Sequence, residues 1–285
     1  ADVDLDEKFE FECSLIAEKL VRIVKSCDQP SSCRGFALCW DDGPLVADIE
    51  SKFESLGEAH ALASNRIMKL VSEKTSAALK WLLCPRWYNG PMRVISPNLR
   101  EEALQTEDSY LQPLNRIASF DFTFFHTGPE VVSKRITASY LKSLRAYFGA
   151  SRRIVLWDNY PVSDMMPVEV FLAPYCNRDP EVVSLLDGVL SNPMVEAEAI
   201  LIPLATVFDF LNDPVSYDQH KSLSASVQRA IPGLPDVSKA LVDLIISGPS
   251  TILTEDHVRP RKSGKEKRQI LEKVNLIRTK LEGTI

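Results

Sequence analysis

Short apolar segments alternate with longer segments of helical spacing between Arg34 and Pro193. The apolar segments are residues 35–40, 81–84, 122–125, 153–157 and 188–190. They are apolar at nearly every position, which is typical of parallel strands that are covered by helices on both faces. Alternating strands and helices predict an α/β fold.

Helices are expected between and after these strands. Their predicted ranges are residues 4–27, 57–74, 130–147, 194–212, 220–248 and 264–282. The first range carries its large apolar residues at Phe9, Phe11, Leu15, Leu20 and Ile23. The last carries an apolar stripe of Ile270, Val274, Ile277 and Leu281. We expect that stripe to pack on the domain, and a partner bound through 264–282 is the alternative.

Each predicted strand ends in a cluster of polar residues. Several strand ends that carry chemical groups are typical of a TIM (β/α)₈ barrel. A doubly wound sheet would concentrate its site at one switch point, and the chain has no glycine-rich nucleotide motif. We therefore predict the C-terminal strands 4–8 of a barrel over residues 1–215, followed by a C-terminal helical region over residues 216–285.

Five strands do not close a barrel of eight. Because such a barrel takes roughly 250 residues, the N-terminal units, about 100 residues, are expected to be missing before Ala1. A partial barrel exposes two sheet edges. We therefore expect the 285-residue chain to be inactive or poorly folded by itself.

Composition excludes some classes of protein. A net charge of −6 argues against a nucleic-acid partner, and no apolar run is long enough to span a membrane. The six cysteines show no spacing that would hold a metal, so we expect neither a metal nor a cofactor. Free cysteines favour an intracellular protein, while secretion stays open because the N-terminus looks incomplete.

The first polar cluster contains the pair Asp41 and Asp42, directly after a strand. Two close carboxylates repel each other, so the pKa of one should rise. The raised group can then act as a general acid beside an ionised neighbour. A pair that caps a helix or binds a cation is the alternative.

Five strand-end segments resemble, in order, motifs of glycoside hydrolase family 84, which contains the O-GlcNAcases and bacterial β-N-acetylglucosaminidases. Residues 157–164 read Trp-Asp-Asn-Tyr-Pro-Val-Ser-Asp and are similar to Trp-Asp-Asn-x-x-x-Asn-Asp. The other matching segments are residues 36–42, 84–90, 127–133 and 191–198. The order of the matches makes the resemblance more specific than any single motif.

The resemblance implies substrate-assisted retaining catalysis through an oxazoline intermediate. Asp41 would orient the substrate's acetamido group, and Asp42 would protonate the leaving oxygen and then deprotonate water. Tyr88 would line the acetamido pocket, and Asn159 would hold Asp41 or the acetamido group. The pocket for the N-acetyl methyl would be lined by Thr127, Val131 and Trp157. Asp164 and Asn192 would bind ring hydroxyls.

Some residues depart from the family pattern. Trp40 replaces a phenylalanine, and His126 replaces a tryptophan and could in principle act as a metal ligand or acid. The expected partner is a glycoprotein or glycan that carries N-acetylglucosamine. A catalytically inactive carbohydrate-binding or scaffold protein is one alternative. An unrelated hydrolase with a metal bridged by Asp41 and Asp42 is the other.

Overall fold

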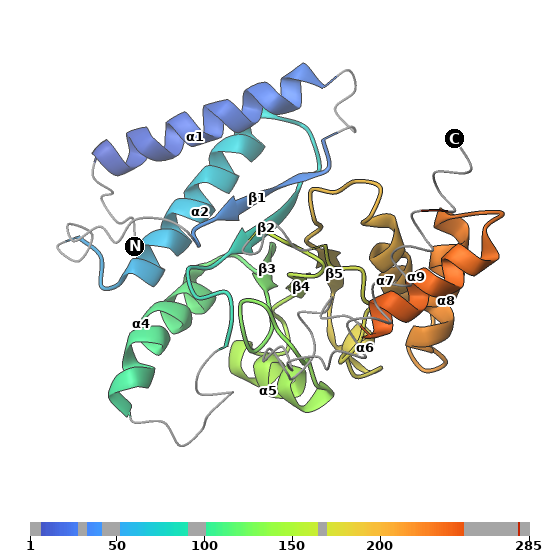
Figure 1. Cartoon of the computed structure of the whole chain (residues 1–285). Helices are drawn as coiled ribbons and strands as arrows, with labels where there is room; N and C mark the ends of the chain where they lie inside the picture. Colours follow the sequence, from blue (N-terminus) through green and yellow to red (C-terminus); the bar gives the residue numbers. More distant parts are fainter. Residues whose placement is uncertain are drawn as a thin grey trace. The chain divides into compact units, whose positions relative to one another are not determined.

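The computed structural model describes residues 7–27, 33–41, 52–90, 101–164, 170–247 and 279, with only the backbone for 101–107 (Figure 1). Its sheet has five strands in the order β1-β2-β3-β4-β5. They are β1 (Gly35–Cys39), β2 (Lys80–Cys84), β3 (Phe122–His126), β4 (Ile154–Asp158) and β5 (Gly188–Ser191). The pairs from β1 to β4 are parallel. The predicted strands and the α/β class are confirmed, while closure into a barrel stays a prediction.

The helices follow the strands in the order that the hydrophobic pattern predicts. Their bounds are α1 (Glu7–Ser26), α2 (Leu56–Lys74), α4 (Glu101–Ile117), α5 (Ala138–Phe148), α6 (Val182–Leu185), α7 (Leu201–Asn212), α8 (Gln219–Ala230) and α9 (Pro235–Ser247). For α4 and α6 the pattern predicted no bounds, only that a helical segment follows each strand. The helix predicted over 264–282 lies outside the described residues except for Thr279, which is helical.

Three predicted helices have different bounds. α5 begins at Ala138 rather than residue 130, because Gly128 and Pro129 open a loop that the Ser133 hydroxyl closes on the Thr127 carbonyl. α7 begins at Leu201 rather than residue 194. The range 220–248 is split between α8 and α9, since Pro232 lacks a backbone N–H and Gly233 has a φ of 80°.

The packing face of α1 is formed by small residues rather than by its large apolar ones. Its buried residues are Cys13, Ala17, Val21 and Val24, whereas Phe11, Leu15 and Ile23 are 61%, 49% and 41% exposed. The buried set keeps helical spacing and consists of small side chains, so α2 can approach α1 closely. Arg66 of α2 adds an ion pair with Glu10, with Nη2 and Oε2 separated by 2.7 Å.

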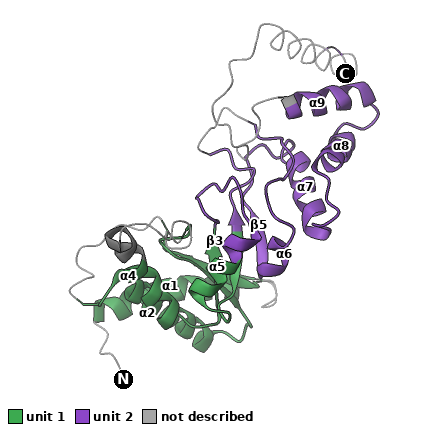
Figure 2. Ribbon diagram, turned by 90° about the horizontal axis from the view of Figure 1, so that it is seen from below, with its two compact units in different colours: residues 1–126, 142–156 green, residues 127–141, 157–285 purple. Residues whose placement is uncertain are grey.

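The chain divides into two compact units, residues 1–126 with 142–156 and residues 127–141 with 157–285 (Figure 2). In the first, α2 packs against both α1 and α4 (Figure 1). In the second, α8 packs against both α7 and α9 (Figure 2). The domain boundary predicted at residue 215 stays a prediction. None of the described helices is both long and apolar enough to cross a membrane.

Candidate active site

The end of strand β4 presents alternate residues to opposite sides. Trp157 and Asn159 are half-buried, whereas Asp158 between them is only 2% exposed. Successive side chains of a strand point to opposite faces, so Trp157 and Asn159 share one face. Asp158 faces the interior of the second unit.

Asn159 is the centre of a small hydrogen-bond network. Its Oδ1 accepts the indole N–H of Trp157 at 3.0 Å and the Nδ2 of Asn192 at 2.9 Å. Its own Nδ2 donates to the Val131 carbonyl at 2.7 Å. An amide carries two N–H groups, and no described residue accepts the second one. The network therefore brings together four of the predicted sugar-binding residues and leaves a donor for a ligand.

Asp158 forms a buried ion pair with Arg178. Its Oδ2 accepts the Nε of Arg178 at 2.9 Å and the Tyr175 hydroxyl at 2.6 Å, and its Oδ1 accepts Nη2 at 2.8 Å. Burial alone would lower the pKa of Arg178, but the charge of Asp158 and the hydrogen bonds to that carboxylate outweigh it and raise that pKa. Arg178 therefore stays protonated.

The same guanidinium also binds the loop that precedes α5. Its Nη2 donates to the Ser133 carbonyl at 2.9 Å and its Nη1 to the Lys134 carbonyl at 3.3 Å. A Cβ at Gly128, whose φ is 99°, would lie 2.5 Å from the Ser133 hydroxyl. Only glycine fits this turn without displacing the loop. Arg178 thus ties the end of β4 to the loop that carries Thr127 and Val131.

The remaining predicted residues of the second unit differ in exposure. Val131 is 41% exposed, and Asp164 is also exposed. Thr127 is only 4% exposed, and its hydroxyl donates to the Glu130 carbonyl at 2.8 Å. Whether these three residues contact a sugar stays a prediction.

The first unit contains the other predicted residues. Asp41 is half-buried and follows β1, and Tyr88 is half-buried beyond the end of β2. Asp42, the predicted general acid, lies outside the described residues. The structure therefore places one of the two predicted acids.

Trp40, directly before Asp41, is held from two sides. Its ring stacks on the His60 imidazole with centroids 4.4 Å apart at 15°. Its indole N–H donates to the Ser64 hydroxyl at 3.0 Å. A phenylalanine could not make this hydrogen bond, so Ser64 and His60 of α2 account for the tryptophan at this position.

The network continues from His60 to the end of β2. The Tyr110 hydroxyl accepts the N–H of Arg86 at 2.8 Å and lies 2.9 Å from Nδ1 of His60. Tyr110 thus hydrogen-bonds both the His60 ring and the backbone of Arg86. Burial first and the Arg86 charge second lower the pKa of His60 to about 4. His60 is neutral at pH 7 and couples the backbone that precedes Asp41 to the backbone that precedes Tyr88.

His126, which could in principle act as a metal ligand or acid, is buried in the structure. It is 2% exposed at the end of β3, and burial lowers its pKa to about 3. No group of three or more His, Cys, Asp or Glu that could hold a metal occurs among the described residues. His126 packs against the Phe148 ring, with centroids 6.4 Å apart, as a neutral core residue.

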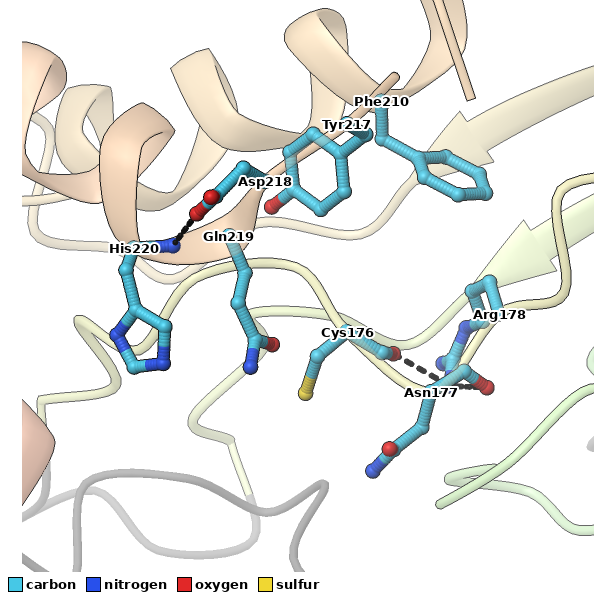
Figure 3. Close-up of a pocket in the computed structure, with 8 residues that line it drawn as sticks. All are labelled: Cys176, Asn177, Arg178, Phe210, Tyr217, Asp218, Gln219 and His220. Atoms are coloured by element: carbon cyan, nitrogen blue, oxygen red, sulfur yellow. Dashed lines mark hydrogen bonds between the residues drawn. The ribbon is translucent and has the colours of Figure 1, made fainter. Parts of the chain in front are cut away.

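A hollow of about 410 Å³ lies beside the segment that carries Arg178 (Figure 3). Its lining residues come from Cys176–Arg178 and from Phe210 and Tyr217–His220, and so differ from the predicted sugar-binding residues. Asp218 caps α8 there by accepting the N–H groups of His220 and Lys221 at 3.0 Å. This hollow does not contribute to the candidate site.

Sequence reasoning missed the residues that hold the site residues in place. Arg178, Tyr175, His60 and Tyr110 lie outside the strand-end motifs and reach them only through the fold. The signal for Arg178 is weak, since a lone arginine in a loop resembles any solvated cation. Asp158 between Trp157 and Asn159 was the available hint, because strand alternation sends it inward and a buried carboxylate needs a partner.

Comparison with known proteins identifies the family. A family model described as beta-N-acetylglucosaminidase matches residues 12–245. The Protein O-GlcNAcase of Mus musculus is 30% identical over 189 residues, which cover 65% of this chain and 19% of the mouse protein. The Protein O-GlcNAcase of Rattus norvegicus is 29% identical over 189 residues, which again cover 65% of this chain and 19% of the rat protein. The match thus spans about a fifth of the length of these curated relatives.

Solved structures agree in fold. A mutant of the Thermobaculum terrenum O-GlcNAc hydrolase has a TM-score of 0.71 and 25% identity over 93% of this chain and 55% of that one. CpGH84B has a TM-score of 0.69 and 21% identity over 91% of this chain and 40% of that one. Because the family model spans most of the chain, the chain belongs to the beta-N-acetylglucosaminidase family, glycoside hydrolase family 84.

Proposed function

We propose that this chain carries the acids and the sugar-binding residues of a glycosidase that releases terminal β-linked N-acetylglucosamine. The observation that carries the proposal is the network around Asn159, which links Trp157, Val131 and Asn192 by hydrogen bonds of 2.7 to 3.0 Å. A preorganised amide beside an aromatic ring suits an acetamido group, which has both polar atoms and a methyl. Membership of the family supports hydrolysis as the reaction.

The acetamido group has a chemical role of its own in this proposal. Its carbonyl oxygen attacks the anomeric carbon, the bond to the leaving oxygen breaks, and an oxazoline forms. Asp41 accepts the acetamido N–H and stabilises the positive charge that develops on the ring. Asn159 holds Asp41 or the acetamido group by its second N–H. The group that attacks belongs to the substrate, so neither aspartate has to reach the anomeric carbon.

Asp42 moves the protons. It protonates the leaving oxygen in the first step and takes a proton from the incoming water in the second, which opens the oxazoline with retained configuration. Two adjacent aspartates can divide these roles because one stays ionised while the other carries the proton.

The other residues fix which sugar enters. Trp157, Thr127 and Val131 surround the N-acetyl methyl, and Tyr88 lines the acetamido pocket. Asp164 and Asn192 accept and donate hydrogen bonds to ring hydroxyls. The substrate class is a glycoprotein or glycan with a terminal N-acetylglucosamine, and the name of the mouse relative, Protein O-GlcNAcase, favours a modified protein.

Two measurements test the proposal. Titration calorimetry with the complete gene product should detect binding of N-acetylglucosamine and not of glucosamine, and Asn159→Ala should abolish this binding. In the complete gene product, 4-nitrophenyl N-acetyl-β-glucosaminide should be cleaved. Binding without cleavage would favour the inactive carbohydrate-binding protein, and absence of both would reject the proposed function.

A further inference from the structure

Two cysteines face each other at the ends of neighbouring strands. Cys39 is the last residue of β1, Cys84 is the last residue of β2, and the two are register partners in the parallel pair. Neighbouring strands lie about 4.8 Å apart, and register partners project their side chains to the same face. The two thiols are therefore neighbours in the first unit.

The two thiols have different surroundings. Cys39 is exposed, whereas Cys84 is 6% exposed and its sulfur lies 3.8 Å from the Pro85 carbonyl oxygen. A hydrogen bond from Cys84 lowers the pKa of Cys39, against the opposing effects of burial and the Asp41 charge. Burial raises the pKa of Cys13 to about 11 and also raises that of Cys176. Cys39 is thus accessible to solvent, and its thiol ionises more readily than those of Cys13 and Cys176.

The backbone already has the geometry that a disulfide needs. Cα atoms joined by a disulfide lie about 4.4–6.8 Å apart, which includes the strand spacing given above. The Trp40 N–H donates to the Cys84 carbonyl at 2.9 Å, so the two strand ends are fixed against each other in this register. This register therefore places the two Cα atoms at a spacing that a disulfide can bridge.

We propose that Cys39 and Cys84 form a dithiol site that hydrogen peroxide oxidises to an intramolecular disulfide. The Cys39 thiolate attacks one peroxide oxygen, the O–O bond breaks, and a sulfenic acid and hydroxide form. Cys84 then attacks the Cys39 sulfur, an S–S bond forms, and the S–O bond breaks. The proton of Cys84 leaves with the oxygen as water. The peroxide is reduced by two electrons to water, and a dithiol reductant reverses the change.

This site is independent of the glycosidase proposal but adjoins its residues. Asp41 is two residues after Cys39, and Tyr88 is four residues after Cys84. A disulfide would join the two strand ends covalently just before these side chains. Oxidation would thus constrain the backbone directly before the predicted acid pair, and the oxidant would not have to contact the substrate.

The test uses the reduced 285-residue chain. It is treated with a small excess of hydrogen peroxide, alkylated, digested and analysed by mass spectrometry. We expect the peptides that contain Cys39 and Cys84 to appear as one linked species that lacks two hydrogen atoms, and dithiothreitol to separate them. Cys39→Ser should abolish the link, and because Cys39 is exposed this change should leave the melting temperature unaltered. Cys27→Ser, a change at another partly exposed cysteine, should leave the link intact.

Three results would overturn the proposal. The first is Cys39 recovered as a sulfenic or sulfinic acid with no link to Cys84. The second is a link from Cys39 to a different cysteine or to a second chain. The third is both peptides recovered fully alkylated after peroxide. Each is read in the wild-type chain, so none depends on a variant that folds or on glycosidase activity.

Discussion

The guanidinium of Arg178 donates two hydrogen bonds to the carboxylate of Asp158, at 2.9 and 2.8 Å. The Arg178 side chain is 0% exposed and that of Asp158 is 2% exposed. Asp158 lies between Trp157 and Asn159, the two residues that we assign to the acetamido pocket. The remaining donors of Arg178 reach the carbonyls of Ser133 and Lys134. One buried cation therefore sets the position of β4 relative to the loop that carries Val131.

Replacement of Arg178 should disturb both stability and ligand binding. Arg178→Met leaves the Asp158 charge buried and unpaired, which should lower the free energy of unfolding by about 3–5 kcal/mol. The loop at 133–134 also loses its anchor, so we expect the Kd for N-acetylglucosamine to rise at least tenfold, about 1.4 kcal/mol. Chemical denaturation and titration calorimetry measure the two effects.

A double variant separates the two effects. Asp158→Leu with Arg178→Met removes both charges, and apolar replacements of a buried pair are often neutral for stability. Stability should recover while binding stays weak, because the anchor of the loop is still missing. If the double variant regained both stability and wild-type affinity, Arg178 would not position the site.

Arg152 offers a stability test that leaves the second unit unchanged. Its buried guanidinium donates to the carbonyls of Asn115, Ala118, Ser119 and Phe122 at 2.7 to 3.3 Å, which satisfies the end of α4. It also lies over the rings of Phe120 and Phe124. Arg152→Met should cost about 3 kcal/mol or more, since several buried acceptors lose their donor. Thermal unfolding measures it, and an unchanged melting temperature would contradict the assigned role.

His60 should make the free energy of unfolding depend on pH in the acidic range. The pKa of His60 is about 4 in the folded chain, against an ordinary 6.5. Between these values the unfolded chain binds the proton and the folded chain does not, so the free energy of unfolding falls as the pH decreases from about 6.5 to 4. The slope from this one group is at most about 1.4 kcal/mol per pH unit. Urea unfolding between pH 7 and pH 4 measures it.

The control for this prediction is a second histidine in a different setting. His60→Gln keeps a hydrogen-bonding group for Tyr110 but cannot be protonated, so it should reduce the acid dependence. His220→Gln, at an exposed position of α8, should leave the dependence as it is. Equal slopes in wild type and His60→Gln would show that His60 is not buried as a neutral base.

The two aspartates should respond differently to substitution in the complete gene product. Asp42→Asn should abolish cleavage of poor leaving groups and partly spare 4-nitrophenol, because an activated leaving group needs little protonation. Asp41→Asn should reduce both rates, since orientation of the acetamido group is needed whatever the leaving group. Steady-state rates with both substrate types separate the cases. A wild-type rate for Asp41→Asn would remove the role given to it.

The strands could be predicted from the sequence because their pattern is local. The run at 81–84 is apolar throughout, and the run at 122–125 is apolar except for Thr123. The structure extends each run by a single residue. The residues that follow them were identifiable for the same reason, as polar clusters directly after buried runs. The end of a strand fixes where a following side chain lies.

The missed features depend on contacts distant in sequence. Arg152 lies 33 residues beyond Ser119, and Arg178 lies 45 beyond Ser133, so no local spacing reveals either contact. The buried face of α1 does not follow its largest apolar residues, since Phe11, Leu15 and Ile23 are exposed. Close approach of α2 favours the small residues Cys13 and Ala17 instead. Packing geometry, rather than hydrophobicity, decides these cases.

The central claim is that the acetamido group of the substrate is the nucleophile, and substitution of that group tests it most directly. The complete gene product is given 4-nitrophenyl β-glucosaminides whose N-acetyl methyl carries zero, one, two or three fluorine atoms. Fluorine withdraws electrons from the carbonyl oxygen, so we expect kcat/KM to fall steeply with each added fluorine. A rate that does not change along the series would mean that a protein group attacks the sugar, which would contradict the account.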